Sequence, residues 1–193
     1  TPASSNGTRA GPAGPGARSC CTSYISAQAP APCADTDSVC KINTLLKKIQ
    51  ADPKEPENYY NLGLAYQKAG NYKQSADLYS MYVALPGIKP EYLADGYNNR
   101  GMMRRMMNQH DLAAQDYTKA MELNPTDPAF ASNRGNAYLS LKKYDAAIAD
   151  YGRAIKIKPT YALAYAGRAH VYMDLGKTAE AVQDFTSAIS YDA

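Results

Sequence analysis

The chain has 193 residues, of which 45% are hydrophobic and 20% are charged, as is typical of one domain or a short repeat array. Its apolar runs are short, so the sequence predicts no membrane-spanning helix. The formal net charge of +3 has no clustered basic stretch, which argues against nucleic-acid binding. Only 2 histidines are present, which disfavours most metal and acid–base chemistry.

Residues 1–35 form a low-complexity segment. Gly, Pro, Ala, Ser and Thr fill most of its positions, and large apolar side chains are nearly absent. Such a segment buries too little surface to offset the entropy of ordering it, so we expect it to form an extended tail. Asn6 lies in an N-x-T sequon and is a candidate glycosylation site.

The cysteines of the chain are clustered near its start and are Cys20, Cys21, Cys33 and Cys40. A bond between the adjacent Cys20 and Cys21 would be strained. This leaves Cys20–Cys33 with Cys21–Cys40, or Cys20–Cys40 with Cys21–Cys33, and pairing to another chain is also open. Reduced thiols are an alternative, and a zinc site is disfavoured because no C-x-x-C spacing occurs.

Disulfides imply an oxidising compartment, so we expect an extracytoplasmic location: secreted, cell-surface or periplasmic. The chain begins at Thr1 rather than Met, which fits a mature or trimmed chain.

Residues 36–55 contain a predicted helix over 38–51. Asp37 or Ser38 could cap its N-terminus, and Pro53 follows its end. Its apolar residues have helical spacing and are Val39, Ile42, Leu45, Leu46 and Ile49.

From residue 56 onward the sequence repeats. A small residue recurs at Gly63, Gly101, Gly135 and Ala169. Sixteen residues beyond each of them comes an aromatic residue: Tyr79, Tyr117, Tyr151 and Phe185. The last three copies are evenly spaced, whereas the first interval is longer by four residues, which indicates an insertion near Pro86 to Pro90.

This period and pattern resemble the tetratricopeptide repeat (TPR) family. The resemblance implies an all-α fold: a right-handed α-solenoid of four helical hairpins over 56–89, 94–127, 128–161 and 162–193. Residues 36–55 would then be a half-repeat that caps the start of the solenoid. The Gly or Ala would let the two helices of a hairpin approach closely, and the aromatic residue would fill the space between layers.

Three residues depart from the pattern. Arg104 replaces an aromatic residue, and Tyr82 and Ser75 each replace an alanine. These departures indicate that repeat one packs more loosely than the others, or that a neighbouring molecule covers it.

The resemblance also implies a concave groove that is lined by the first helix of each hairpin. The candidate groove residues are Asn61, Asn98, Asn99, Met102, Arg105, Asn133, Asn136 and His170. Asn61, Asn99 and Asn133 occupy equivalent positions, as in TPR superhelices that hold an extended peptide by its backbone. An amide offers both a donor and an acceptor, as a peptide unit does. The alternative is that these asparagines merely solvate the groove.

The last predicted helix spans 178–191. No polar capping helix follows it in the sequence, whereas solenoids normally carry one. We therefore expect the apolar face formed by Ala181, Phe185 and Ala188 to meet water or another molecule, and we assign it as a candidate assembly face.

No catalytic motif occurs in the sequence, and none of its patterns indicates a cofactor or a metal ion. The sequence thus predicts a non-enzymatic scaffold for protein–protein interaction. The first hypothesis is an exported subunit that self-assembles, as a filament or an oligomer, through its tail and its last repeat. The alternative is a monomeric exported adaptor that binds an extended peptide of another protein. A third hypothesis, an accessory fragment of an enzyme complex, has only the breadth of the family behind it.

Overall fold

The computed structural model describes residues 38–192, which contain nine α-helices and no strand. The helices are α1 (Ser38–Ala51), α2 (Pro56–Lys68), α3 (Tyr72–Ala84), α4 (Pro90–Met106), α5 (His110–Leu123), α6 (Pro128–Ser140), α7 (Tyr144–Ile157), α8 (Ala162–Asp174) and α9 (Thr178–Tyr191). Predictions for the tail, for Asn6 and for the cysteines at 20, 21 and 33 lie outside the described residues. The helix predicted over 38–51 is present as α1.

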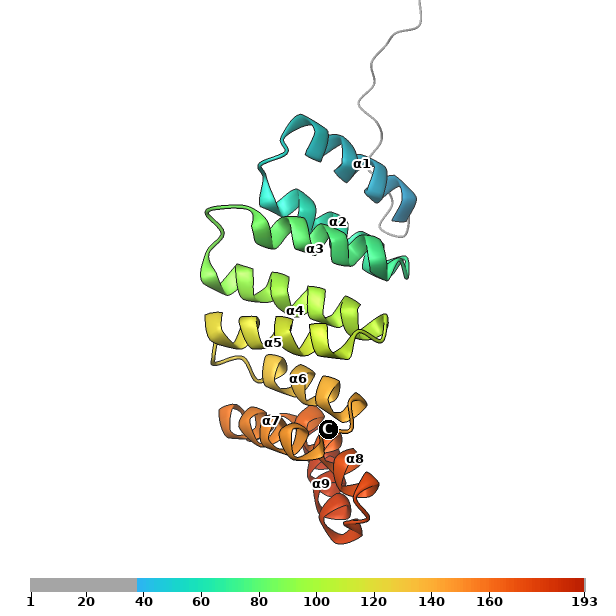
Figure 1. Cartoon of the computed structure of the whole chain (residues 1–193), viewed down its shortest axis with the longest axis vertical. Coiled ribbons are helices and arrows are strands. Elements are labelled where there is room, and N and C mark those ends of the chain that lie inside the picture. Colours follow the sequence, from blue (N-terminus) through green and yellow to red (C-terminus); the bar gives the residue numbers. More distant parts are fainter. Residues whose placement is uncertain (1–37, 193) are drawn as a thin grey trace, which may run out of the picture. The chain divides into compact units, whose positions relative to one another are not determined.

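Each helix packs against the next one along the chain, and α2 to α9 form four helical hairpins (Figure 1). The first helices of neighbouring hairpins also touch: α4 contacts α6, and α6 contacts α8. The first helices therefore line the inner side of the stack. We call their exposed surface the inner face.

The helix ends follow from local sequence. Proline occupies the first turn of α2, α4 and α6, where its missing N–H leaves no hydrogen bond unmade. Each hairpin turns through a residue with positive φ, and these are Gly70, Asn108, Lys142 and Gly176. Glycine adopts this left-handed conformation without a steric penalty, and asparagine tolerates it.

The core is built from repeated contacts between a glycine and a tyrosine ring. A Cβ atom added to any of these glycines would lie about 3 Å from the ring of its partner, which is closer than ordinary contact. The pairs are Gly63 with Tyr79, Gly101 with Tyr117 and Gly135 with Tyr151. The three tyrosines are fully buried, so the predicted close approach of the two helices in each hairpin is confirmed.

The four-residue insertion lengthens a helix. Helix α4 has 17 residues, whereas α2 and α6 have 13 each. It begins at Pro90, before Ala94, where the repeat pattern starts. Four residues are close to one turn of α-helix, so the insertion adds a turn and leaves the later register unchanged.

The expectation of loose packing in repeat one was wrong. Tyr82 is only 5% exposed, and its ring lies against Gly96, where a Cβ atom would approach it to 2.5 Å. Ser75 is fully buried and donates a hydrogen bond of 2.8 Å to the carbonyl of Gly63. Arg104 forms an ion pair with a carboxylate of α5. Each departure from the repeat pattern therefore has a partner that satisfies it.

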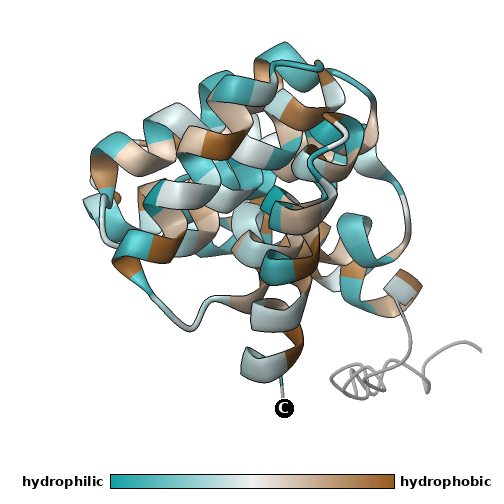
Figure 2. Ribbon diagram, turned by 90° about the horizontal axis from the view of Figure 1, so that it is seen from below, coloured by the Kyte–Doolittle hydropathy of each residue, from teal (hydrophilic) through white to brown (hydrophobic). Residues whose placement is uncertain are grey.

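The residues predicted to form an exposed assembly face on α9 were also wrong. Ala181 is fully buried, Ala188 is 8% exposed, and Phe185 is half-buried, because this face packs against α8 of its own hairpin. The exposed apolar residues of α9 include Val182 (59% exposed) and Ile189 (75%). Figure 2 shows hydrophobic segments on the helix that ends at the C-terminus.

Candidate functional site

The residues predicted to line a groove lie on the first helices. Asn61 is on α2, and His170 is on α8. Helix α4 carries Asn98, Asn99, Met102 and Arg105, and α6 carries Asn133 and Asn136. All are half-buried except His170, which is exposed. The structure thus concentrates the candidate residues on α4 and α6, in the middle of the inner face.

Asparagine side chains connect neighbouring first helices. The Asn99 amide donates a hydrogen bond of 2.9 Å to the hydroxyl of Tyr60 on α2. The Asn133 amide donates one of 2.9 Å to the Asn98 side-chain oxygen on α4. Each of these donor amides retains a second N–H and a carbonyl oxygen with spare capacity. The inner face is therefore polar and held together across repeats, and it keeps hydrogen-bonding capacity for a ligand.

Two of the predicted groove residues, Asn61 and His170, lie outside this network. The Asn61 amide donates only a long hydrogen bond of 3.4 Å to Glu57 on its own helix. His170 packs edge-to-face on Phe185, with ring centroids 5.2 Å apart. The equivalent positions 61, 99 and 133 therefore do not act alike, because each amide finds different neighbours.

Arg105 places a cation on the inner face. It forms no ion pair among the described residues, and its buried Nε atom has no hydrogen-bond acceptor there. Burial raises the pKa of Tyr117 to about 12, and the positive charge of Arg105 lowers it in part. Beside it, Asn136 accepts a hydrogen bond of 2.7 Å from the Tyr151 hydroxyl. Because Nε is buried, a ligand with a carboxylate or a carbonyl group would instead accept hydrogen bonds from the terminal nitrogens of the half-buried Arg105.

Sequence reasoning missed a set of repeated ion pairs. Within each of the last three hairpins, an arginine of the first helix binds an aspartate of the second through two hydrogen bonds. The pairs are Arg100 with Asp116, Arg134 with Asp150 and Arg168 with Asp184. The aspartates are at most 5% exposed, so the bidentate geometry is needed to offset their desolvation. The signal was present in the sequence as an Arg and an Asp at a constant separation, recurring once in each of the last three repeats.

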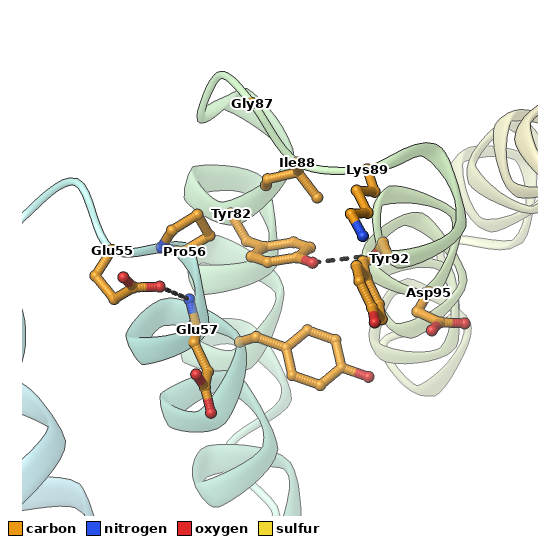
Figure 3. Close-up of a pocket in the computed structure, with 10 residues that line it drawn as sticks. Glu55, Pro56, Glu57, Tyr82, Gly87, Ile88, Lys89, Tyr92 and Asp95 are labelled. Carbon is orange, nitrogen blue, oxygen red and sulfur yellow. Dashed lines mark hydrogen bonds between the residues drawn. The ribbon is translucent and has the colours of Figure 1, made fainter.

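The insertion also forms a pocket that the sequence did not indicate. The pocket has a volume of about 620 Å³ and lies where α2, the end of α3 and the start of α4 meet (Figure 3). Tyr60, Tyr82 and Tyr92 supply aromatic walls, and the charged lining residues are Glu55, Glu57, Lys89 and Asp95. Burial raises the pKa of Asp95, and the nearby carboxylate of Asp127 raises it further. Burial likewise raises the pKa of Tyr60, partly offset by its hydrogen bond from Asn99.

The described residues contain neither a metal cluster nor a helix that could span a membrane. Within residues 38–192, no three side chains of His, Cys, Asp or Glu are grouped so as to hold a metal ion. Of the helices described, none combines the length and the apolar character that crossing a bilayer requires.

Comparison with protein families explains the repeated geometry. A model described as "TPR repeat" matches residues 135–176. Three models described as "Tetratricopeptide repeat" match residues 94–127, residues 116–149, and residues 56–80 with 162–193. The chain belongs to the tetratricopeptide repeat family. The resemblance seen in the sequence is thus confirmed, and so is the helical solenoid it implied.

Solved TPR structures share the fold. A crystal structure of MamA is 26% identical, with a TM-score of 0.70, and the match covers 78% of this chain and 86% of that one. MamA from Desulfovibrio magneticus RS-1 (residues 41 to the end) is 16% identical, with a TM-score of 0.73 and coverage of 81% and 86%. YrrB, described as a TPR protein with an unusual peptide-binding site, is 19% identical, with a TM-score of 0.66 and coverage of 80% and 77%. Among curated proteins, the comparison found no match.

The TPR fold and the contacts above define two surfaces that suit a protein ligand. One is the inner face around Asn98, Asn133 and Arg105. The other is the apolar outer side of α9 around Val182 and Ile189. Both are suited to protein–protein interaction.

Proposed function

We propose that this TPR protein is a non-enzymatic scaffold that self-assembles end to end as an exported subunit. The observation that carries the proposal is the exposure of apolar side chains on α9. In the preceding hairpin, the residues equivalent to Val182 and Ile189 are Ile148 and Ile155. Those two are partly buried and pack into the largest core cluster. In α9, the same surface meets no helix among the described residues.

The opposite end of the stack has complementary properties. Helix α1 also exposes apolar side chains, with Val39 at 68% and Leu46 at 39% exposure. It carries three lysines and no acidic residue. Helix α9 carries no basic residue and has the exposed carboxylate of Glu180, whereas its Asp184 is already paired with Arg168. A contact of α9 with α1 of a second copy would bury both apolar surfaces and bring opposite charges together. Because the two surfaces differ, such a contact is heterologous and generates rings or filaments.

The N-terminal segment supports the exported location and a role in assembly. Its cysteines are clustered between positions 20 and 40, with the last one on α1, at the proposed interface. Disulfides between these cysteines, within a chain or between chains, would strengthen the assembly in an oxidising compartment.

Sedimentation velocity of the full chain over a range of concentrations tests the proposal. Wild type should associate with increasing concentration, and Ile189→Lys should remain monomeric, because it places a charge in the contact without disturbing a buried site. Met81→Lys, an equally simple change at an exposed position of α3, is the matched control and should associate like wild type. Runs with and without reductant separate disulfide linkage from packing. A wild-type chain that stays monomeric in both conditions contradicts the proposal.

The inner face favours a second candidate function, an adaptor that binds an extended peptide of another protein. Its specific support is the spare hydrogen-bonding capacity of the Asn99 and Asn133 amides, together with the cation that Arg105 places on the first helices. A peptide array probed with the full chain tests it. Binding should weaken in Arg105→Gln and Asn133→Ala and be unchanged in Gln115→Ala, which alters an exposed residue of α5. Equal binding by all variants would exclude the inner face as the site.

A further inference from the structure

The pocket between α2, α3 and α4 exists because repeat one differs from the others. The extra turn of α4 brings Tyr92 beside Tyr82, and the Tyr82 hydroxyl donates a hydrogen bond of 3.1 Å to the Tyr92 carbonyl. Gly96 leaves room for the Tyr82 ring. The loop residue Ile88 closes the upper side (Figure 3). The equivalent connections α5–α6 and α7–α8 lack the insertion, so this pocket is particular to the first connection among the described repeats.

Aromatic rings form the walls of the pocket. Tyr60 and Tyr82 lie with ring centroids 5.3 Å apart and planes tilted by 55°. Tyr60 also meets the buried Tyr79 edge-to-face at 5.7 Å. Tyr92 is 56% exposed and stands at the rim. Faces of tyrosine rings attract cations through their negative quadrupole.

The charges around the pocket are mostly negative. Glu55, Glu57 and Asp95 contribute three carboxylates, and Lys89 is the one basic residue of the lining. Glu55 accepts a hydrogen bond from the Glu57 backbone N–H, and Glu57 accepts a long one from Asn61, but no ion pair among the described residues neutralises the three. A guanidinium ion that enters the pocket would meet tyrosine rings and carboxylates together, and both kinds of group stabilise it.

We propose that this pocket binds the guanidinium group of Arg9 or Arg18 in the N-terminal segment of a second copy of the chain. Those two arginines are the only charged side chains in residues 1–34, so the segment is purely basic and complementary to the pocket. Their neighbours are mostly Gly, Ala, Pro, Ser and Thr, whose small side chains allow an extended backbone to approach the surface closely. This proposal rests on the self-assembly proposed above, to which it adds the residues that make the contact.

The test uses a fluorescent peptide of residues 3–19 and the full chain carrying Arg9→Ala and Arg18→Ala, so that no native tail competes. The peptide should bind, and replacing both of its arginines by citrulline, which keeps the shape and removes the charge, should weaken binding about tenfold. Glu57→Gln with Asp95→Asn in the receptor should weaken binding by a similar factor. Lys89→Gln should strengthen it, because this change removes a competing cation from the pocket. Glu91→Gln, an exposed change on α4 outside the pocket, is the control and should have no effect.

The outcomes separate this proposal from the proposed function. The arginine contact is overturned if the arginine and citrulline peptides bind equally. It is also overturned if the Glu57/Asp95 variant, with its circular dichroism unchanged, binds the peptide as well as the unmodified receptor does. If wild type then still associates in sedimentation, the self-assembly proposal stands without it. If wild type remains monomeric, assembly is contradicted and the second copy is excluded as the donor of the arginine. Association in wild type that is weakened by the Glu57/Asp95 pair, and unchanged by Glu91→Gln, supports both.

Discussion

The recurring arginines make one further contact, and its absence in the last hairpin leads to a prediction. Arg134 donates a hydrogen bond of 2.9 Å to the hydroxyl of Thr118 in the preceding hairpin. Arg100 donates one of 3.3 Å to the hydroxyl of Ser80. The equivalent residue for Arg168 is Gly152, in the middle of α7, which has no side chain to accept. We predict that Gly152→Ser restores this contact and stabilises the protein.

The size of the effect follows from three contributions. A Cβ atom at Gly152 would meet no atom within 4 Å, so the new side chain creates no clash. Replacing glycine inside a helix by alanine contributes about 1 kcal/mol to stability, and serine contributes about half of that. A hydrogen bond to a charged group adds about 1.5–3 kcal/mol when buried, and we take the lower end because Arg168 is partly exposed. The free energy of unfolding should therefore rise by about 2 kcal/mol for serine and about 1 kcal/mol for alanine.

Urea unfolding followed by circular dichroism at the helical signal measures both variants against wild type. Gly152→Ala is the control, because it supplies the helix propensity without the hydroxyl. The reasoning is refuted if Gly152→Ser is no more stable than Gly152→Ala, since serine is the weaker helix former and only the contact with Arg168 can reverse that order.

Two other predictions use the buried tyrosines. Gly167→Ala should destabilise the protein by about 1–3 kcal/mol, because its Cβ would lie 2.4 Å from the Tyr151 ring. In the same urea assay, the change in unfolding free energy should have the opposite sign to that of Gly152→Ala. Stability should also fall in alkali, because burial raises the pKa of Tyr82 and Tyr117 from 10.0 to about 12. The neutral hydroxyls therefore stabilise the fold fully below pH 10, and this contribution is lost as the pH rises through about 12. Tyrosinate absorbance and unfolding free energy measured against pH check this; titration of every tyrosine near pH 10 with no change in stability would contradict it.

The architecture could be predicted because it depends on contacts that recur in sequence. Each hairpin needs a small residue where its two helices meet and a ring to fill the adjacent space. Gly135 and Tyr151 satisfy both needs sixteen residues apart, as do Gly101 and Tyr117. A constant repeat period that preserves this pairing therefore predicts stacked helical hairpins.

The orientation of the final helix could not be predicted from the same pattern. A repeat period shows which positions are equivalent but does not show which side of α9 faces its own hairpin. Ala181 and Ala188 are small because they lie against α8, and smallness at an interface marks close packing rather than exposure. The equivalents of Val182 and Ile189 in the preceding hairpin, which are larger and partly buried, would have identified the outward surface.

The sequence predicted which polar residues lie on the inner face but not which hydrogen bonds they form. Asparagines at equivalent positions were expected to act as a row, yet Asn99 bonds to a tyrosine and Asn133 to Asn98, which is one position earlier in its repeat. Side-chain hydrogen bonds depend on the neighbour within about 3 Å, and that neighbour changes from repeat to repeat even where the backbone does not. Periodicity therefore predicts where polar groups gather but not which of them remain available for a ligand.

The pocket results from two departures from the repeat that act together. At the next junction between hairpins, the residues equivalent to Tyr82 and Gly96 are Ala120 and Phe130, so the large and small residues have exchanged helices. Both junctions keep a similar total volume and stay packed, which is why the exchange is tolerated. At the first junction the aromatic ring comes from the second helix of the preceding hairpin, because Tyr82 lies on α3. The Tyr82 hydroxyl thereby reaches the extra turn of α4. The insertion supplies Tyr92 and Lys89, and the exchange supplies Tyr82. Neither change alone would form an aromatic pocket beside the carboxylates of α2 and α4.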